Sequence, residues 1–361
     1  EFALTRAREY AEPVIVHVIT EKGHGYTPAE EHVPDRFHAV GKIHPETGLP
    51  VVAERFGWTA VFAEEIVSLA QRDERIVGVT AAMQAPVGLQ PLADAMPERV
   101  IDVGIAEQHA LTSAAGMAYA GLHPVVALYA TFLNRAFDQV LMDVGLHGAG
   151  VTIVLDRAGL TGTDGASHNG MWDMALFCLV PGLRLAAPRD ERTLREALRT
   201  AVGVDDGPTI VRYPKGALPG PLPEVRTVGD DGDEGPFGAV DVLLEAAGEG
   251  PGGPLLLVGV GAMVPATLEA GRALVARGEA VTVACPRWVV PVPRALVGLA
   301  AAARGVVVVE DGLVEGGVGS RLRDALEDGA AHGGARPVVA RVGVPRRFVA
   351  TASRPQLLAD F

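Results

Sequence analysis

The residue with the clearest potential for chemistry is Glu107, within the stretch 99–111, RVIDVGIAEQHAL. An apolar segment leads into Gly104, and a run of small residues typical of a packed helix begins just after it. Glu107 can be interpreted as a purely structural residue, because the helix dipole stabilises acidic side chains in the first turn of a helix. The alternative is a buried carboxylate that takes part in proton chemistry. The stretch by itself leaves both interpretations open. In either case we expect apolar neighbours to be buried, namely Val100, Ile101, Val103, Ala110, Leu111, Ala114 and Ala115.

Polar side chains also follow three other apolar segments that are typical of strands. Because ligands bind beyond the carboxyl ends of parallel strands, we expect these side chains to meet at one rim. A single charged loop residue is usually only solvated, but the grouping favours a site. Arginine suits phosphate through its bidentate guanidinium, and histidine moves protons near neutral pH. The residues are Tyr129, Phe132 and Arg135 after 125–129; Arg157, Asp164, Ser167 and His168 after 151–156; and Arg212 and Lys215 at the end of 209–213.

The elements that must position these residues alternate between strand and helix. The expected strands are apolar on both faces, which is typical of a parallel sheet covered on two sides by helices. A stretch rich in Pro, Gly, Asp and Glu, 217–252, follows this unit and suggests a linker with a short strand or helix at 240–247. A second α/β unit follows it. We also expect a buried strand at 13–19, and a polar surface crossing at 28–50 that contains His32, His38 and His44.

Composition limits the classes of function. The length of 361 residues suggests two or three domains, and 48% hydrophobic residues suffice for a large core. The net charge of −13 argues against nucleic acid or an anionic membrane as the main partner. The two cysteines, Cys178 and Cys285, show neither metal-ligand nor disulfide spacing, which fits a reducing cytoplasm. No apolar run approaches the length of a membrane span, and complete nucleotide-binding motifs are not found.

Six strings together resemble the transketolase-like thiamine diphosphate enzymes, and most closely the 1-deoxy-D-xylulose-5-phosphate synthase family. The resemblance extends over nearly the whole chain, up to the EDG…GGVGS string at 310–320. It implies two doubly wound α/β domains, one with a parallel sheet and one with a mixed sheet. The implied boundaries are 1–50 for the tail of a diphosphate-binding domain and a crossing loop, 51–216 for the pyrimidine-binding domain, 217–252 for the linker and 253–361 for the C-terminal domain. The strings are KGHGYTPAE (22–30), FHAVGK (37–42), DVGIAEQHA (102–110), YATFLNRAFDQV (129–140), DRAGLTGTDGASHNG (156–170) and VRYPKG (211–216).

The resemblance implies a reaction in which pyruvate is decarboxylated and its two-carbon unit is joined to D-glyceraldehyde 3-phosphate. The products are CO2 and 1-deoxy-D-xylulose 5-phosphate, a precursor of isoprenoids, thiamine and pyridoxal. The implied cofactors are thiamine diphosphate and Mg²⁺. The family is dimeric, so we expect a cytoplasmic homodimer, and helix 106–121 is a plausible interface.

The resemblance also implies roles for individual residues. Glu107 matches the glutamate that binds N1′ of the aminopyrimidine, and Phe132 matches the aromatic residue packed on that ring. His38, Asp164 and His168 match polar residues at the reacting end, where they would carry protons. The residues matching the substrate side are Tyr129, Arg157 and Arg212 in the acceptor pocket, the arginines gripping its phosphate, and the neighbouring Arg135.

The family's GDG…N motif, which holds the diphosphate and Mg²⁺, has no counterpart in this sequence, so we expect the metal ligands to lie in a missing N-terminal domain. We therefore interpret the chain as a truncated form that is inactive alone and binds the cofactor weakly. Smaller departures are Asn169 in place of glutamine and a less glycine-rich loop at Ala82–Pro86. Two alternatives stay open. One is the β subunit of a 2-oxo acid dehydrogenase, which would lack FHAV and the 157–168 loop. The other is a non-catalytic subunit that pairs through helix 106–121.

Overall fold

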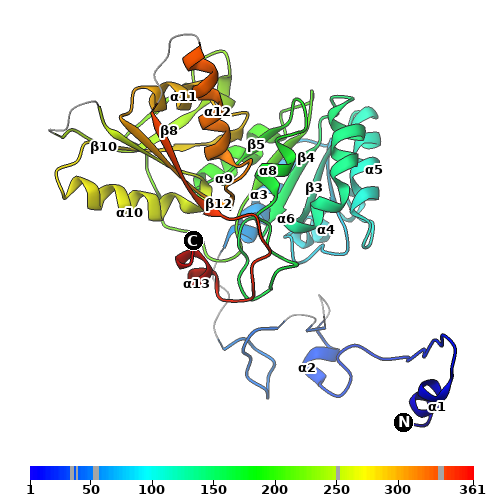
Figure 1. Ribbon diagram of the computed structural model, residues 1–361. Helices are drawn as coiled ribbons and strands as arrows, with labels where there is room; N and C mark the ends of the chain where they lie inside the picture. The colour runs from blue at the N-terminus through cyan, green and yellow to red at the C-terminus, as the bar shows by residue number, and fades with distance from the viewer. Residues whose placement is uncertain (33–35, 38–39, 52–56, 249–252, 332–336) are drawn as a thin grey trace. The chain divides into compact units, whose positions relative to one another are not determined.

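The computed structural model describes residues 1–32, 36–37, 40–51, 57–248, 253–331 and 337–361, and it divides into two compact units (Figure 1). Unit 1 is Glu1–Arg55 and unit 2 is Phe56–Phe361. Unit 1 contains the helices α1 (Phe2–Glu9) and α2 (Thr27–Glu30), joined by irregular segments. A turn-rich part is held by the Tyr26 hydroxyl, which donates to the carbonyl of Pro45 at 2.8 Å.

The prediction of a buried strand at 13–19 is wrong. These residues form no regular element, and Ile15 and Ile19 are 94% and 88% exposed. A strand is stable only when a neighbouring strand accepts and donates its backbone hydrogen bonds. Within the described part of unit 1, the only such pairing is an isolated bridge between Ile43 and Pro50.

The first sheet of unit 2 has seven strands in the order β11-β5-β6-β4-β3-β1-β2. Six of them are parallel, and β11 adds antiparallel to β5 at one edge. Every residue of β1, β4 and β6 is buried, which is the expectation for a parallel sheet with helices on both faces. The strands are β1 (Ile76–Thr80), β2 (Val100–Asp102), β3 (His123–Tyr129), β4 (Thr152–Asp156), β5 (Arg184–Ala186), β6 (Thr209–Arg212) and β11 (Trp288–Val290).

Along the chain, helices alternate with the strands of the first sheet. The longest are amphipathic or rich in small residues, and their buried sides pack on the sheet. A π-helix at Val140–Gly145 continues the short helix α7. The helices are α3 (Trp58–Arg72), α4 (Gln90–Ala95), α5 (Glu107–Tyr119), α6 (Ala130–Leu133), α7 (Phe137–Gln139), α8 (Asp173–Phe177) and α9 (Glu191–Ala201).

The burial predicted around Glu107 is only partly correct. The α5 residues Ala110, Leu111, Ala114 and Ala115 are buried, as expected. In contrast, Ile101 is 37% exposed, and Val100 and Val103 are half-buried. The reason is that β2 is the edge strand of the sheet and pairs only with β1.

The second sheet has six strands in the order β13-β12-β9-β10-β8-β7. Four are parallel, whereas β8 and β7 are antiparallel additions, so the sheet is mixed as predicted. The stretch 217–252 is thus more than a linker, because it contributes both β7 and β8; the strand-or-helix expectation at 240–247 is met by a strand. The elements are β7 (Arg226–Val228), β8 (Val240–Ala246), β9 (Leu255–Gly259), β10 (Val281–Pro286), β12 (Gly305–Leu313), β13 (Val338–Val344), α10 (Val264–Val275), α11 (Arg294–Ala301), α12 (Val318–Ala331) and α13 (Arg354–Ala359).

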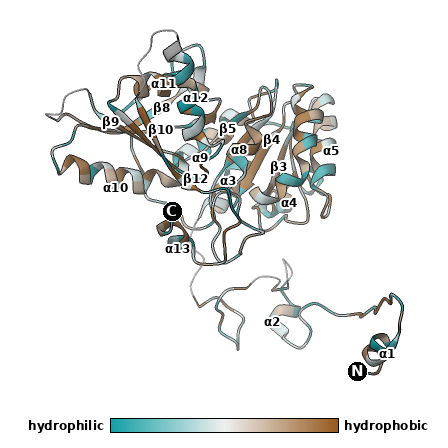
Figure 2. Cartoon of the chain, viewed as in Figure 1, coloured by the Kyte–Doolittle hydropathy of each residue, from teal (hydrophilic) through white to brown (hydrophobic). Residues whose placement is uncertain are grey.

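Unit 2 therefore consists of two α/β domains, each built on one sheet, which confirms the predicted fold class. Figure 2 shows that the strands of both sheets are the most hydrophobic elements, while the helices alternate in hydropathy. Across the described ranges, none of the helices combines the length and apolar character that crossing a bilayer requires.

A buried polar ladder crosses three neighbouring strands of the first sheet. His123 at the start of β3 is fully buried, and its Nε2 lies 2.9 Å from Oγ1 of Thr152 in β4. Thr152 in turn contacts Oγ1 of Thr209 in β6 at 3.0 Å. Burial lowers the pKa of His123, and Arg75 adds to this effect, although Asp205 and Asp73 oppose it. The imidazole is therefore held neutral in the folded chain.

This ladder predicts a specific loss of stability in acid. As pH falls below about 6.5, the unfolded histidine takes up a proton before the folded one does, so the free energy of unfolding decreases. The contribution of His123 to this decrease is at most about 1.4 kcal/mol per pH unit. The decrease levels off once the pH falls below the pKa of His123 in the folded chain. We expect His123→Gln to remove this contribution. Chemical denaturation from pH 8 to pH 5 measures it as the difference between wild type and variant.

The matched control is His147→Gln, because His147 is exposed and lies outside the ladder. This variant should follow the wild-type pH dependence. If His123→Gln shows the same pH slope as the wild type, the assignment of the acid sensitivity to His123 is incorrect.

Candidate active site

The carboxyl ends of β3, β4 and β6 lie next to one another at one edge of the first sheet. The register pairs Tyr129 with Asp156 and Leu155 with Arg212. Strand β2 lies two places from β3, but α5, which follows β2, packs against β3. Three of the four predicted strand ends are thus direct neighbours, and the fourth reaches them through its helix. The parallel topology accounts for this convergence.

Glu107 is the first residue of α5 and is 2% exposed. Its Oε2 accepts no hydrogen bond within the described structure, and it lies 3.6 Å from Nη1 of Arg135. A buried carboxylate oxygen without a donor is costly, because it has lost its hydration without replacement. The Arg135 side chain is 55% exposed, so it only partly compensates the charge. Glu107 Oε2 is therefore a buried oxygen whose hydrogen-bonding capacity is unfilled within the described structure.

A row of aromatic and cationic side chains extends from Glu107 along the rim. Arg135 lies over the ring of Phe132 at 5.9 Å, and Phe132 stacks with Tyr129 at 5.7 Å. Arg157 lies 3.9 Å over the Tyr129 ring, and His168 meets the edge of Phe132 at 5.6 Å. The structure thus brings together six of the predicted site residues: Glu107, Tyr129, Phe132, Arg135, Arg157 and His168.

Two buried groups lie beneath Arg157. Burial raises the pKa of Asp156 to about 6, although Arg157 and a 2.6 Å hydrogen bond from Thr59 oppose the shift. Burial also raises the pKa of Tyr129 to about 12, so its hydroxyl keeps its proton at neutral pH. Arg157 has a φ of +59°, and its Nη1 lies 3.7 Å from Oδ1 of Asp156. The backbone of Arg157 thus adopts a left-handed conformation that non-glycine residues rarely use, and the guanidinium of the same residue lies at the rim.

The loop 157–170 forms a closed structure above these groups. Gly159 and Gly170 exchange backbone hydrogen bonds of 3.0 and 2.7 Å at its neck. Inside it, Oδ1 of the fully buried Asn169 accepts from the backbone and the hydroxyl of Thr161. Oδ1 of Asn169 therefore holds Thr161 within the loop, whereas its Nδ2 has no partner within the described residues. On the other side, Lys215 donates to both carboxylate oxygens of Asp164 at 3.0 and 2.8 Å.

Arg212, the last residue of β6, is buried, and its Nη2 has no hydrogen-bond partner within the described residues. It is 3% exposed, and it donates through Nε to Asp173 at 2.6 Å and through Nη1 to Asp311 at 2.9 Å. Its charge is thus used to pair buried carboxylates. Lys215, whose side chain is 40% exposed, is the cation that this strand end presents beside Asp164.

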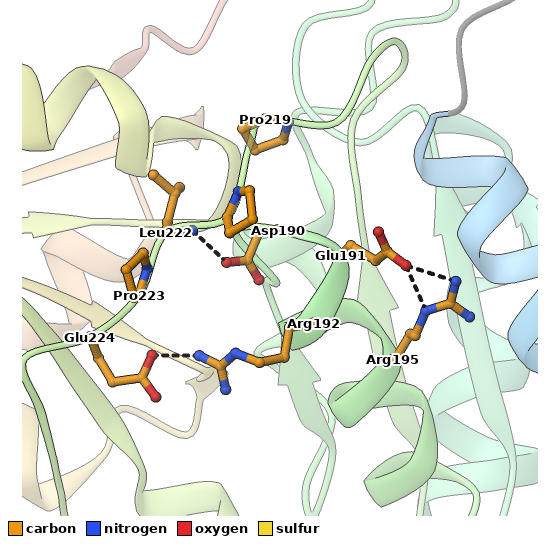
Figure 3. A pocket seen from close by; sticks show the side chains of 9 residues that line it. Asp190, Glu191, Arg192, Arg195, Pro219, Leu222, Pro223 and Glu224 are labelled. Atoms are coloured by element: carbon orange, nitrogen blue, oxygen red, sulfur yellow. Dashed lines mark hydrogen bonds and ion pairs between the residues drawn. The ribbon is translucent and has the colours of Figure 1, made fainter.

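The remaining predicted residue, His38, lies outside the described residues. Within the described ranges, no group of three or more His, Cys, Asp or Glu side chains is arranged to hold a metal ion. A cavity of about 570 Å³ lies elsewhere, between the start of α9 and the segment 219–224 (Figure 3). Its charged side chains pair with one another, as Arg192 does with Glu224 and Arg195 with Glu191. We therefore centre the site on the rim.

Two family profiles match this chain. The transketolase pyrimidine-binding domain matches residues 54–221, and the transketolase C-terminal domain matches residues 245–361. Together they account for both sheets of unit 2. The chain belongs to the transketolase family.

Among curated proteins, the chain is similar to the 1-deoxy-D-xylulose-5-phosphate synthase of Clavibacter sepedonicus. The two are 55% identical over 359 residues, which are 99% of this chain and 53% of the relative. It is 56% identical to 1-deoxy-D-xylulose-5-phosphate synthase 2 of Kitasatospora griseola over 362 residues, covering 100% of this chain and 55% of the relative. These similarities confirm the resemblance given by the motifs. The chain spans about half the length of the curated relatives it matches.

A solved structure described as a split-gene transketolase, an inactive β4 tetramer, has the same fold. It superposes with a TM-score of 0.65 at 29% identity, covering 80% of this chain and 89% of that one. The two sheets of unit 2 thus have a counterpart in a separately encoded transketolase chain.

The contrast between Arg212 and Lys215 predicts effects of unequal size on stability. Arg212→Gln would leave Asp173 and Asp311 buried without their shared cation, so we expect a loss of about 3–5 kcal/mol. Lys215→Gln removes an ion pair at a half-exposed position, and we expect a change below about 1 kcal/mol. Urea denaturation followed by circular dichroism measures both. Wild-type stability in Arg212→Gln would show that the buried ion pairs do not depend on this guanidinium.

Proposed function

We propose that this chain carries the pyrimidine-binding and acceptor-binding part of a 1-deoxy-D-xylulose-5-phosphate synthase. The proposed reaction joins the two-carbon unit of pyruvate to D-glyceraldehyde 3-phosphate and releases CO2. The observation that carries the proposal is the unpartnered, buried Oε2 of Glu107, which Arg135 links to the aromatic ring of Phe132. The names of the relatives at 54–56% identity support the choice of reaction within the family.

Thiamine diphosphate is the cofactor that these residues fit. When bound, it supplies the electron sink that decarboxylation of a 2-oxo acid requires. Glu107 Oε2 would accept a hydrogen bond from the aminopyrimidine at N1′, and this would satisfy the buried oxygen. Phe132 would pack against the ring face. The half-exposed Arg135 lies between this carboxylate and solvent, so it would limit access of water and stay near the substrate.

The acceptor end would lie on the other side of Phe132. Arg157 and Lys215 present two cations near the neck of the loop 157–170, and they are suited to the phosphate of glyceraldehyde 3-phosphate. The protonated hydroxyl of Tyr129 would donate to the same substrate. His168 and Asp164 would move the protons of the carbonyl groups that react. The phosphate role predicted for Arg212 stays part of the proposal, since its buried Nη2 has no partner within the described residues, and Lys215 adds a cation beside Asp164.

The diphosphate and its Mg²⁺ would bind to a second part of the enzyme. The relatives are about twice as long as this chain, and the split-gene transketolase is described as inactive in its β4 form. Both observations support the proposal that residues 1–361 by themselves are inactive and bind the cofactor weakly. We propose a cytoplasmic location, which the two free cysteines support.

Self-association is supported by an apolar face along α5 and the neighbouring π-helix. Exposed apolar patches of this kind mark interaction sites, and we propose that a second copy of the chain covers this one. Sedimentation equilibrium should show a dimer or larger species, and Leu146→Glu should weaken it while Val225→Glu, in a distant exposed position, should not. A monomer at micromolar concentration would refute this proposal. The face contains Ile105, Tyr119, Leu122, Met142 and Leu146.

The proposed function is tested by adding the N-terminal half of a relative to this chain. We expect the chain, mixed with the N-terminal half of the Clavibacter sepedonicus relative, thiamine diphosphate and Mg²⁺, to form 1-deoxy-D-xylulose 5-phosphate, while neither part does so alone. Glu107→Gln should lower the rate at least about 100-fold, because hydrogen bonds that act on the reacting centre contribute on that scale. Glu98→Gln, an exposed glutamate just before β2, is the matched control and should keep full activity.

The same mixture separates the alternatives. Assembly of the two parts without turnover would favour the non-catalytic subunit. Decarboxylation of pyruvate with transfer to lipoamide, and none to glyceraldehyde 3-phosphate, would favour the dehydrogenase β subunit. Equal activity in wild type and Glu107→Gln would refute the role given to Glu107.

A further inference from the structure

We propose that Asp311 and Arg354, which come from the C-terminal domain, are positioning residues for the loop 157–170. This loop carries Asp164 and His168, so the consequence for chemistry rests on the function proposed above. The positioning itself is a statement about the structure of this chain. Neither Asp311 nor Arg354 touches the row of rim residues described above.

Asp311 lies directly beneath the neck of the loop. It is 1% exposed, near the carboxyl end of β12, and its carboxylate accepts from Arg212 and Arg354 at 2.9 Å each. A Cβ built on Gly159 would lie 2.1 Å from an oxygen of Asp311. The backbone of the loop is thus seated against this carboxylate, and only glycine fits at the contact. Burial would raise the pKa of Asp311, but the two arginines outweigh it and lower the pKa.

Arg354 ties the loop to the same carboxylate. Its Nη2 donates to Asp311, and its Nη1 donates to the backbone carbonyl of Leu160, the loop residue next to Gly159. One planar guanidinium therefore bridges the C-terminal domain and the loop. The side chain is 19% exposed, so this bridge is shielded from water.

Two further glycines of the loop close on the segment that leads into α13. A Cβ on Gly162 would lie 2.8 Å from the backbone nitrogen of Arg354, and one on Gly165 would lie 2.9 Å from Oγ1 of Thr351. Each of these glycines has a positive φ. The side of the loop away from the rim is therefore covered by C-terminal residues along most of its length.

Apolar packing supports the same arrangement. The backbone amide of Leu313, at the end of β12, donates to the carbonyl of Met171 just after the loop at 3.1 Å. A separate buried cluster joins loop residues with the C-terminal segment. Because the supported side faces the C-terminal domain, the opposite side is left to present Asp164 to Lys215 and His168 to Phe132. The cluster consists of Leu160, Met171, Leu313, Val344, Val349 and Leu357.

The test is hydrogen exchange in this chain with Arg354→Gln. Loss of the bridge should raise amide exchange in the peptides covering 160–169 at least about tenfold, because the opening of the loop then costs less free energy. Peptides from β4 and β9 should exchange as in the wild type. Arg347→Gln is the matched control, since Arg347 lies in the same segment, is exposed and contacts Phe361 rather than the loop.

Unchanged exchange in 160–169 would overturn the proposal. If Arg354→Gln instead opens β4 and β9 as well, Arg354→Lys decides. Lysine keeps the charge beside Asp311 but cannot bridge to Leu160 at the same time. Faster exchange confined to 160–169 in that variant supports the positioning role, and wild-type exchange contradicts it.

A second readout concerns turnover in the reconstituted mixture. When catalytic groups are displaced, the rate of the chemical step falls more than the affinity for the substrate does. We expect Arg354→Gln to lower kcat at least about tenfold, with the KM for pyruvate within about twofold of wild type. A general structural defect in Arg354→Gln would instead lower the active fraction of that variant and leave kcat per active site unchanged, and Arg347→Gln should match the wild type in both quantities. Because exchange is measured without turnover, an inactive mixture would count against the proposed function and leave the positioning result intact.

Discussion

The arrangement of the two sheets in unit 2 depends on four charges that alternate in sign, three of them buried and the fourth, Arg354, partly buried. Asp173 and Arg212 come from the first sheet domain, and Asp311 and Arg354 come from the second. Buried ions are costly unless each one is paired and hydrogen-bonded. Here every member has an oppositely charged partner at 2.6–2.9 Å, and these pairs form only when the two domains are together, although Nη2 of Arg212 has no partner within the described residues. Strand β11, which leaves the second domain to pair with β5, fixes the same contact through its backbone.

The candidate site follows from this junction and from the parallel topology. The sheet order places the ends of β3, β4 and β6 side by side, and the loop that leaves β4 is seated on Asp311. Glu107 enters from the far side, on the first turn of α5. The result is a site with two ends, one a buried carboxylate that Arg135 links to an aromatic ring, the other a pair of cations. The division suits a reaction in which a ring cofactor and a phosphorylated acceptor must meet.

Much of this could be predicted from the sequence, because the strands of the first sheet are continuous apolar runs. The ends of β3 and β4 and the start of α5 were found in this way, and with them Glu107, Tyr129, Phe132, Arg157 and His168. Local pattern failed where burial depends on distant partners. The segment 13–19 is as apolar as a core strand but has no strand beside it, and Ile101 is exposed because β2 is an edge.

Arg212 illustrates the same limit within the site. Its type and position favoured a phosphate ligand, but its partners are Asp173, 39 residues earlier, and Asp311, 99 residues later. No local signal announces such a pairing. The roles of Asp311 and Arg354 were invisible for the same reason, since each acts on a loop that lies more than 140 residues away in the sequence.

The central claim is that Glu107 offers its buried oxygen to the pyrimidine ring of thiamine diphosphate. A crystal structure of the chain in the reconstituted mixture, with the cofactor bound, measures the distance from Glu107 Oε2 to N1′. We predict a charge-assisted hydrogen bond of about 2.6–2.9 Å, with the ring packed on Phe132. A pyrimidine ring bound elsewhere, with Glu107 still facing only Arg135, would contradict the claim.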